Sequence, residues 1–184
     1  MARDRSSYNH DVLALIGKRI ARVTYYELEY DKVNTPCYEW PPFPGHLLDF
    51  GLDLELSDGS IHGFIWDTEY HQYGIGNTNC RLSSRLARWT SWDATGLSQW
   101  SPFIDKTITH VDVYWSWIEY KGHERCDYPQ DTVLRFPESK SLYLSAADYK
   151  HESDKLFEAS DNIAVIFDAF SAKRYQIGEF ANDA

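Results

Sequence analysis

The sequence has 184 residues, of which 43% are hydrophobic and 16% aromatic, and it carries a formal net charge of −10. This apolar content excludes a disordered chain, and the length suffices for one domain with a sizeable core. No stretch approaches the roughly 18 to 20 consecutive apolar residues of a membrane-spanning helix, and the polar N-terminus lacks the features of a secretory signal, so we expect a cytoplasmic protein with no membrane partner.

Most of the chain predicts β-strands. Runs that alternate between apolar and polar side chains, and that are rich in β-branched and aromatic residues, are typical of strands. These runs are residues 19–30, 48–56, 60–66, 107–120, 132–136, 141–144, 163–167 and 173–177. Gly59 tolerates the positive φ of a tight turn, so the second and third runs are expected to form a hairpin. Within it, the alternation predicts that Leu52 and Leu54 face the core while Asp53 and Glu55 face water.

Two short helices and two irregular segments complete the prediction. Residues 8–16 have an apolar face and a suitable N-cap in Asn9, and residues 83–89 follow as a second short helix. The Pro-rich segment 31–47 and the segment 148–160 are expected to be loop and turn regions.

Residues 11–26 and 99–114 resemble each other at an offset of 88 residues. Identical residues at this offset are Ile16 and Ile104, Lys18 and Lys106, Ile20 and Ile108, Val23 and Val111, and Tyr26 and Tyr114. Such a repeat indicates duplication of one supersecondary unit. The predicted fold class is therefore mainly β, or β-rich α+β, with two similar antiparallel units at 1–80 and 99–184, joined by a connecting segment at 81–98 into one domain.

The acidic charge is concentrated in the first half. Residues 26–80 hold ten acids against one base, Lys32, a net charge of −9. Such a negative field repels phosphate backbones, so we expect no nucleic-acid binding. A basic protein is the partner whose charge complements it.

The two copies of the repeat differ where their strands end. The first has Glu27 and Glu29 at the positions that Trp115 and Trp117 occupy in the second. Aromatic side chains beside acids are common at protein interfaces. The residues that we expect to bind a partner are Glu27, Glu29, Tyr38, Glu39, Trp40, Asp53 and Glu55. The leading hypothesis is a non-enzymatic protein-binding module, one form of which is a bacterial immunity-type protein that neutralises a basic toxin.

An alternative is a small-molecule-binding or enzymatic β-domain with an aromatic pocket between the two units. Its candidate residues are Trp66, Asp67, Glu69 and His71. On a strand, the last three share one face, where they would place an acid and a base together or bind a cation. The same alternation also fits a solvated face. A third hypothesis is a homodimer in which the repeat pairs with itself across a two-fold axis.

Motifs for common cofactors and catalytic machinery do not occur in the sequence. It contains no phosphate-binding loop, dinucleotide fingerprint, zincin motif or nucleophile elbow. The cluster at 123–127 combines metal-ligand residue types, but only Cys37 and His46 would complete a site, so no metal and no cofactor are predicted. Cys37, Cys80 and Cys126 are widely spaced, which favours reduced thiols. The sequence leaves enzymatic activity open but favours a non-enzymatic protein, and no catalytic residue is assigned.

Overall fold

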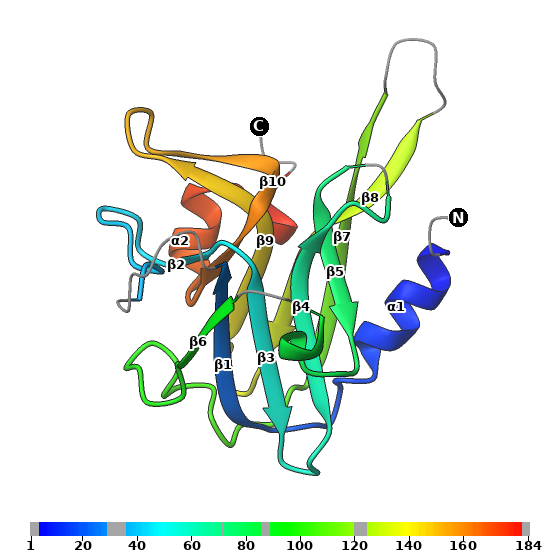
Figure 1. The fold of residues 1–184 in the computed structure, drawn as a ribbon, viewed down its shortest axis with the longest axis vertical. Helices are drawn as coiled ribbons and strands as arrows, with labels where there is room; N and C mark the ends of the chain where they lie inside the picture. The colour runs from blue at the N-terminus through cyan, green and yellow to red at the C-terminus, as the bar shows by residue number, and fades with distance from the viewer. Residues whose placement is uncertain (1–3, 29–35, 71, 86–88, 120–124, 182–184) are drawn as a thin grey trace.

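The computed structural model describes residues 4–28, 36–70, 72–85, 89–119 and 125–181. Within them it confirms a mainly β chain with two short α-helices, arranged as two antiparallel sheets (Figure 1). The helices are α1 (Arg5–Leu13) and α2 (Ala169–Arg174), with 3-10 turns η1 (Leu82–Ser84) and η2 (Gly178–Phe180). The strands are β1 (Ile20–Leu28), β2 (His46–Leu48), β3 (Gly51–Leu56), β4 (Ile61–Asp67), β5 (Gly74–Thr78), β6 (Trp89–Asp93), β7 (His110–Ile118), β8 (Cys126–Arg135), β9 (Ser141–Lys150) and β10 (Lys155–Ile166).

The two sheets are similar in topology. The first sheet has the order β5-β4-β3-β1-β6, and the second has the order β2-β10-β9-β8-β7. Both contain a four-strand antiparallel meander, in which β1, β3, β4 and β5 correspond to β7, β8, β9 and β10. Each fifth strand comes from outside its meander: β6 lies in the predicted connecting segment 81–98, and β2 belongs to the first half but pairs with β10. The pairing of β2 with β10 joins the two halves. Their origin by duplication stays a prediction.

The hydrophobic core lies between the two sheets. Val23, Tyr25 and Leu54 point into it from the first sheet, and Leu134 and Leu144 from the second. Smaller clusters cover the outer faces: α2 packs on the second sheet, and Leu82 of η1 packs on the first. Both faces of each sheet are therefore buried along part of their length.

The β3–β4 hairpin has the predicted turn, with Gly59 at φ +83°, and Leu52, Leu54 and Leu56 are buried as expected. The expectation that Asp53 faces water is wrong, since its exposed fraction is only 1%. The Tyr26 hydroxyl donates a 2.8 Å hydrogen bond to Asp53 Oδ2, and the Leu82 amide donates to Oδ1 at 3.2 Å. Alternation within one strand carries no information about a distant segment that covers its outer face.

The N-terminal helix is confirmed but begins earlier than predicted. Its N-cap is Asp4, whose carboxylate accepts a 3.1 Å hydrogen bond from the Ser7 amide. Asn9, the predicted cap, instead accepts a hydrogen bond from Nε1 of Trp115 at 3.1 Å. This contact fastens α1 to β7, beside which the helix lies in Figure 1.

Other local predictions need correction. The expected strand at 173–177 is wrong, because Asp168 caps α2 by accepting a 2.8 Å hydrogen bond from the Ser171 amide. The expected turn region 148–160 is instead largely the β9–β10 hairpin, which projects beyond the sheets at the same end as the β7–β8 hairpin (Figure 1). The second helix predicted at 83–89 is only the turn η1, with residues 86–88 outside the described part of the chain. Among the described residues, no helix has the length and apolar character needed to cross a bilayer.

Candidate functional site

A cavity of about 310 Å³ opens where the end of β1, the segment before β3 and the β9–β10 hairpin meet. Its lining residues are Glu27, Cys37, Trp40, Leu47, Asp49, Asp148, Tyr149 and Asn162. Glu27 belongs to the first sheet, while Asp148, Tyr149 and Asn162 belong to the second. This acidic cleft therefore lies at the junction of the two sheets and draws on three separate parts of the chain.

Glu27 is held rigidly in the wall of the acidic cleft. It is 7% exposed, and its Oε2 accepts a 2.6 Å hydrogen bond from Nε1 of Trp92 on the neighbouring strand β6. Its Oε1 accepts a second hydrogen bond, of 3.1 Å, from the Cys37 amide. Burial raises the pKa of Glu27, and the two donors act against that rise because they stabilise the carboxylate.

Asp49 lies directly after β2 and is half-buried. Its Oδ1 accepts a 2.9 Å hydrogen bond from the Leu28 amide, which places the carboxylate next to the end of β1. Burial, with a smaller contribution from the negative charge of Glu27, raises the pKa of Asp49 to about 6. The carboxylate is therefore mostly ionised at neutral pH but becomes protonated in mild acid.

The acids of the cleft lack the basic partners that several acids elsewhere in the chain have. Across the described ranges, a number of acidic side chains form ion pairs with Lys or Arg. They include Glu55, Asp58, Asp93, Asp112, Asp127, Glu138, Asp154 and Glu179. Within the same ranges, Glu27, Asp49 and Asp148 have no such pair. Their negative charge is thus directed at the cavity without a described basic side chain to balance it.

Aromatic side chains complete the walls. Trp40 is 55% exposed, and its Nε1 donates a 2.6 Å hydrogen bond to the carbonyl oxygen of Cys37, which orients the indole. Tyr149 is buried, and its hydroxyl donates to Asp154 Oδ1 at 3.0 Å. An exposed indole beside uncompensated carboxylates is suited to binding a cation, since the ring face and the carboxylates both attract positive charge.

The structure brings together only part of the predicted partner-binding set. Glu27 and Trp40 line the acidic cleft, and Glu39, next to Trp40, is exposed. Tyr38 is buried and packs against Tyr25 and His46, so its side chain is part of the core and does not face the acidic cleft. Glu29 lies outside the described residues.

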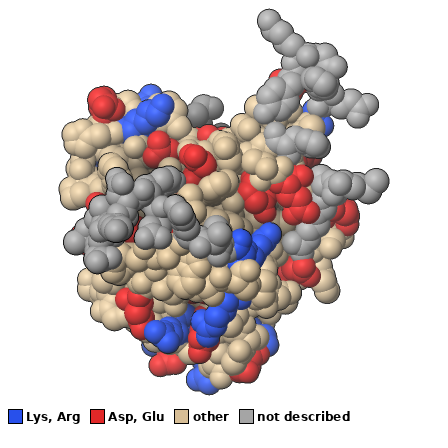
Figure 2. Space-filling model, viewed as in Figure 1, with Lys and Arg blue, Asp and Glu red and all other residues tan. Residues whose placement is uncertain are grey.

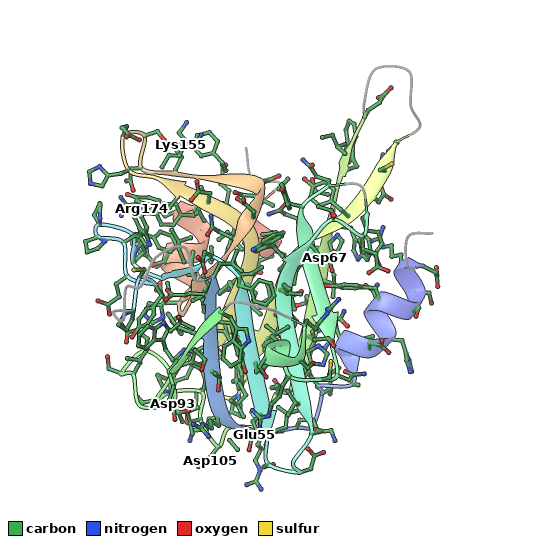
Figure 3. The ribbon with its side chains drawn as sticks, viewed as in Figure 1. Glu55, Asp67, Asp93, Asp105, Lys155 and Arg174 are labelled. Atoms are coloured by element: carbon green, nitrogen blue, oxygen red, sulfur yellow. The ribbon has the colours of Figure 1, made fainter. Side chains whose placement is uncertain are left out.

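Asp53 and Glu55 are not part of the cleft. Asp53 is buried, so it is unavailable to a partner, and Glu55 is half-buried and paired with Arg81 at 2.6 Å. Figure 3 places Glu55 toward the end of the molecule opposite Lys155 of the β9–β10 hairpin. The sequence prediction grouped these two acids with Glu27 and Trp40, but the structure places neither of them in the acidic cleft.

Of the alternative pocket residues that the structure describes, Trp66, Asp67 and Glu69 do not line the acidic cleft. The Trp66 indole donates a 2.8 Å hydrogen bond to the Asp49 carbonyl oxygen and packs at its edge against Phe50 and Tyr73. Asp67, labelled in Figure 3, accepts a 3.0 Å hydrogen bond from the Glu69 amide, and Glu69 is exposed. His71 lies outside the described residues.

No protein-family model matches the chain, and searches of curated proteins and of solved structures find no significant match either. In the described ranges, no group of three or more His, Cys, Asp or Glu side chains is arranged to hold a metal ion. We therefore infer function from the geometry and charge of the cleft.

Sequence reasoning missed Asp49 and Asp148. Asp49 lies within the acidic window, but its residue type alone does not distinguish it from its paired neighbours. Asp148 lies in a segment predicted as a turn, and only the register of β9 against β10, which sets Asp148 opposite Phe157, places it beside the cavity.

Proposed function

We propose that this protein is a non-enzymatic binding module that docks a basic segment of another protein in the acidic cleft between its sheets. The observation that carries the proposal is the convergence of Glu27, Asp49 and Asp148 on one cavity without a described Lys or Arg partner. A basic partner would supply the missing positive charge, and electrostatic complementarity of this kind speeds association and selects partners by sign.

Aromatic anchoring supports a protein rather than an inorganic cation as the occupant. Trp is enriched at binding hot spots because it buries a large area with little conformational entropy loss. Trp40 is one of the large hydrophobic side chains that the structure leaves exposed, and it borders the cleft. Figure 2 shows acidic side chains on both sides of the notch at the upper end of the molecule, whereas most Lys and Arg on that face lie toward its centre and lower end.

The narrower form of the proposal is an immunity-type protein that acts in the cytoplasm and blocks a basic toxin. The acidic charge, the aromatic cleft and the size of the chain support this form, since nuclease-like active sites are basic and are occluded by acidic surfaces. A toxin captured with the full chain should be inhibited when it is mixed with the wild-type protein. It should stay active when it is mixed with the variant that carries both Asp49→Asn and Asp148→Asn.

The general proposal is tested with a defined basic peptide. We expect octalysine to bind the full chain at low salt, and Asp49→Asn with Asp148→Asn to weaken binding at least tenfold. The matched control for Asp49→Asn alone is Asp105→Asn, which likewise removes one negative charge but lies far from Lys155 in Figure 3. Asp105 has φ 58°, a conformation that Asn tolerates. Equal weakening by the control would show non-specific charge attraction and would overturn the cleft as the binding site.

A further inference from the structure

We propose that residues 178–181, which contain η2, form a releasable strap over the outer face of the second sheet, and that the carboxyl group of Asp131 is the latch that holds the strap closed in mild acid and lets it open toward neutral pH. None of these residues lines the acidic cleft, so the inference does not depend on the proposed function.

The strap covers a short stripe of β8. Asp131 and Val133 lie on the outer face of this strand, and Gly178 lies directly over them. A Cβ atom on Gly178 would meet Val133 Cγ2 at 2.9 Å. It would also lie 3.5 Å from the rings of Tyr114 and Tyr143 on the neighbouring strands β7 and β9. Gly178 has φ +65°, so both its conformation and its close approach to the sheet favour glycine at this position.

Two side-chain attachments hold the strap, and they differ in charge. At one, the Arg135 guanidinium and the Tyr143 hydroxyl donate to Glu179 Oε1 at 3.3 and 3.2 Å. At the other, the Gly178 amide donates a 2.8 Å hydrogen bond to Asp131 Oδ2. The first attachment pairs opposite charges, whereas Asp131 forms no ion pair with a Lys or Arg of the described ranges.

Asp131 is poorly placed to carry a negative charge while the strap is closed. Its side chain is only 3% exposed, and burial raises its pKa to about 7. The nearby charge of Glu158 on β10 adds to this rise in pKa. The Gly178 amide and the polar side chains of Ser145 and Gln130 act against it because they stabilise the carboxylate. The closed strap therefore favours the protonated form of Asp131.

The other charged and titratable groups around the strap were considered in turn. Tyr114 on β7 and Tyr143 on β9 stay neutral, because burial raises the pKa of each above its ordinary value of 10. Arg135 and Glu179 neutralise each other as an ion pair. Burial also raises the pKa of Glu158. Glu158 is therefore the neighbour whose titration must be separated from that of Asp131.

Release of the strap would hydrate Asp131 and return its pKa to the ordinary value near about 4. Between about pH 4 and 7 the released form has then lost a proton that the closed form keeps. The population of the released form should accordingly rise by up to about tenfold for each pH unit in this interval. Above about pH 7 both forms are ionised, so the population should change little further.

Hydrogen exchange of the full chain, followed by mass spectrometry at pH 5, 6, 7 and 8, tests the latch. After correction for the intrinsic exchange rate at each pH, protection of residues 178–181 should fall at least about tenfold from pH 5 to 7 and then level off. Asp131→Asn, which keeps an acceptor for the strap amide, should remove this dependence on pH. The matched controls Glu158→Gln and Asp105→Asn should leave it in place.

A second variant tests the strap without altering the latch. Gly178→Ala should open it at every pH, because the new Cβ meets Val133. Protection of residues 178–181 should then be low and independent of pH, and protection equal to that of the wild type would contradict the close approach of the strap.

Three results would overturn the latch. The first is wild-type protection that does not change with pH. The second is a fall that persists in Asp131→Asn or that disappears in Glu158→Gln. The third is a fall of the same size in the paired strands β8 and β9, since it would show that Asp131 affects only global stability.

Discussion

The hydroxyl of Tyr25 lies 2.8 Å from Nδ1 of His46, and this contact connects the first sheet to β2 of the second sheet. Nε1 of Trp100 donates to the same hydroxyl at 2.6 Å, so the Tyr25 oxygen joins the indole and the imidazole. All three side chains are buried. The chain of hydrogen bonds fixes the position of β2, after which Asp49 enters the cleft.

Replacing Tyr25 with Phe is expected to destabilise the fold by about 2–4 kcal/mol, because the Trp100 N–H and the His46 nitrogen would both lose a buried partner. Urea denaturation followed by circular dichroism measures the change. Tyr73→Phe is the control, since the Tyr73 ring packs on Trp66 in a half-buried position and its loss of a hydroxyl should change stability by under about 0.5 kcal/mol. A cost for Tyr25→Phe as small as that of the control would contradict the network.

His46 should make the fold sensitive to acid. Burial lowers its pKa to about 4, from an ordinary value of 6.5. In this interval the unfolded chain binds a proton at this position and the folded chain does not, so stability is lost as pH falls from about 6.5 to 4, by up to about 3 kcal/mol. In His46→Asn, whose amide group can still form a hydrogen bond with the Tyr25 hydroxyl, the difference in unfolding free energy between pH 7 and pH 4.5 should shrink. An unchanged difference would show that other groups govern acid unfolding.

Asp131 should make the fold less stable as the pH rises, which is the opposite of the effect of His46. It is buried, its Oδ2 accepts a 2.8 Å hydrogen bond from the Gly178 amide, and burial raises its pKa to about 7. Between about pH 4 and 7 the folded chain holds a proton here that the unfolded chain has released, so this group lowers stability as pH rises. Asp131→Asn keeps an acceptor for Gly178 without a charge. We expect the variant to exceed the wild type in stability at pH 8 and to lose that advantage at pH 5, as measured by thermal unfolding at both values.

Peptide binding in the cleft should weaken in mild acid. A cation binds the ionised form of Asp49, whose pKa is about 6 in the free protein, so the affinity should fall by up to about tenfold for each pH unit below 6. Titrations of octalysine at pH 7.5, 6 and 5 test this. In Asp49→Asn the decline should be shallower, and a decline of equal steepness would assign it to other acids.

Trp40 should contribute to affinity with little effect on stability. Because more than half of its side chain is exposed, Trp40→Ala should change the unfolding free energy by under about 1 kcal/mol. Its removal from beside the cation should weaken octalysine binding about threefold to tenfold, while Trp40→Phe should retain part of the affinity. Calorimetric titration measures both variants, and full affinity in Trp40→Ala would exclude the indole from the site.

The local pattern was enough to predict much of the fold. Alternation predicted the ranges of β1, β3 and β4 closely, and Gly59 predicted the turn of the β3–β4 hairpin. Both succeeded because side-chain periodicity and turn conformation depend on neighbours in sequence. The failures occurred where distant segments intervene. Asp53 is buried because Leu82 covers it, and residues 155–160 form a strand because β9 pairs with them.

The sequence by itself determined the mainly β class, the acidic first half and the membership of Glu27 and Trp40 in a candidate binding surface. Only the tertiary structure decided that Asp49 and Asp148 join them, while Asp53 and Glu55 do not. The physical reason is that charge and hydrophobicity are properties of single residues and their neighbours, whereas a cleft is formed by side chains from β1, the β2–β3 link and β9 that meet only when two sheets pack together.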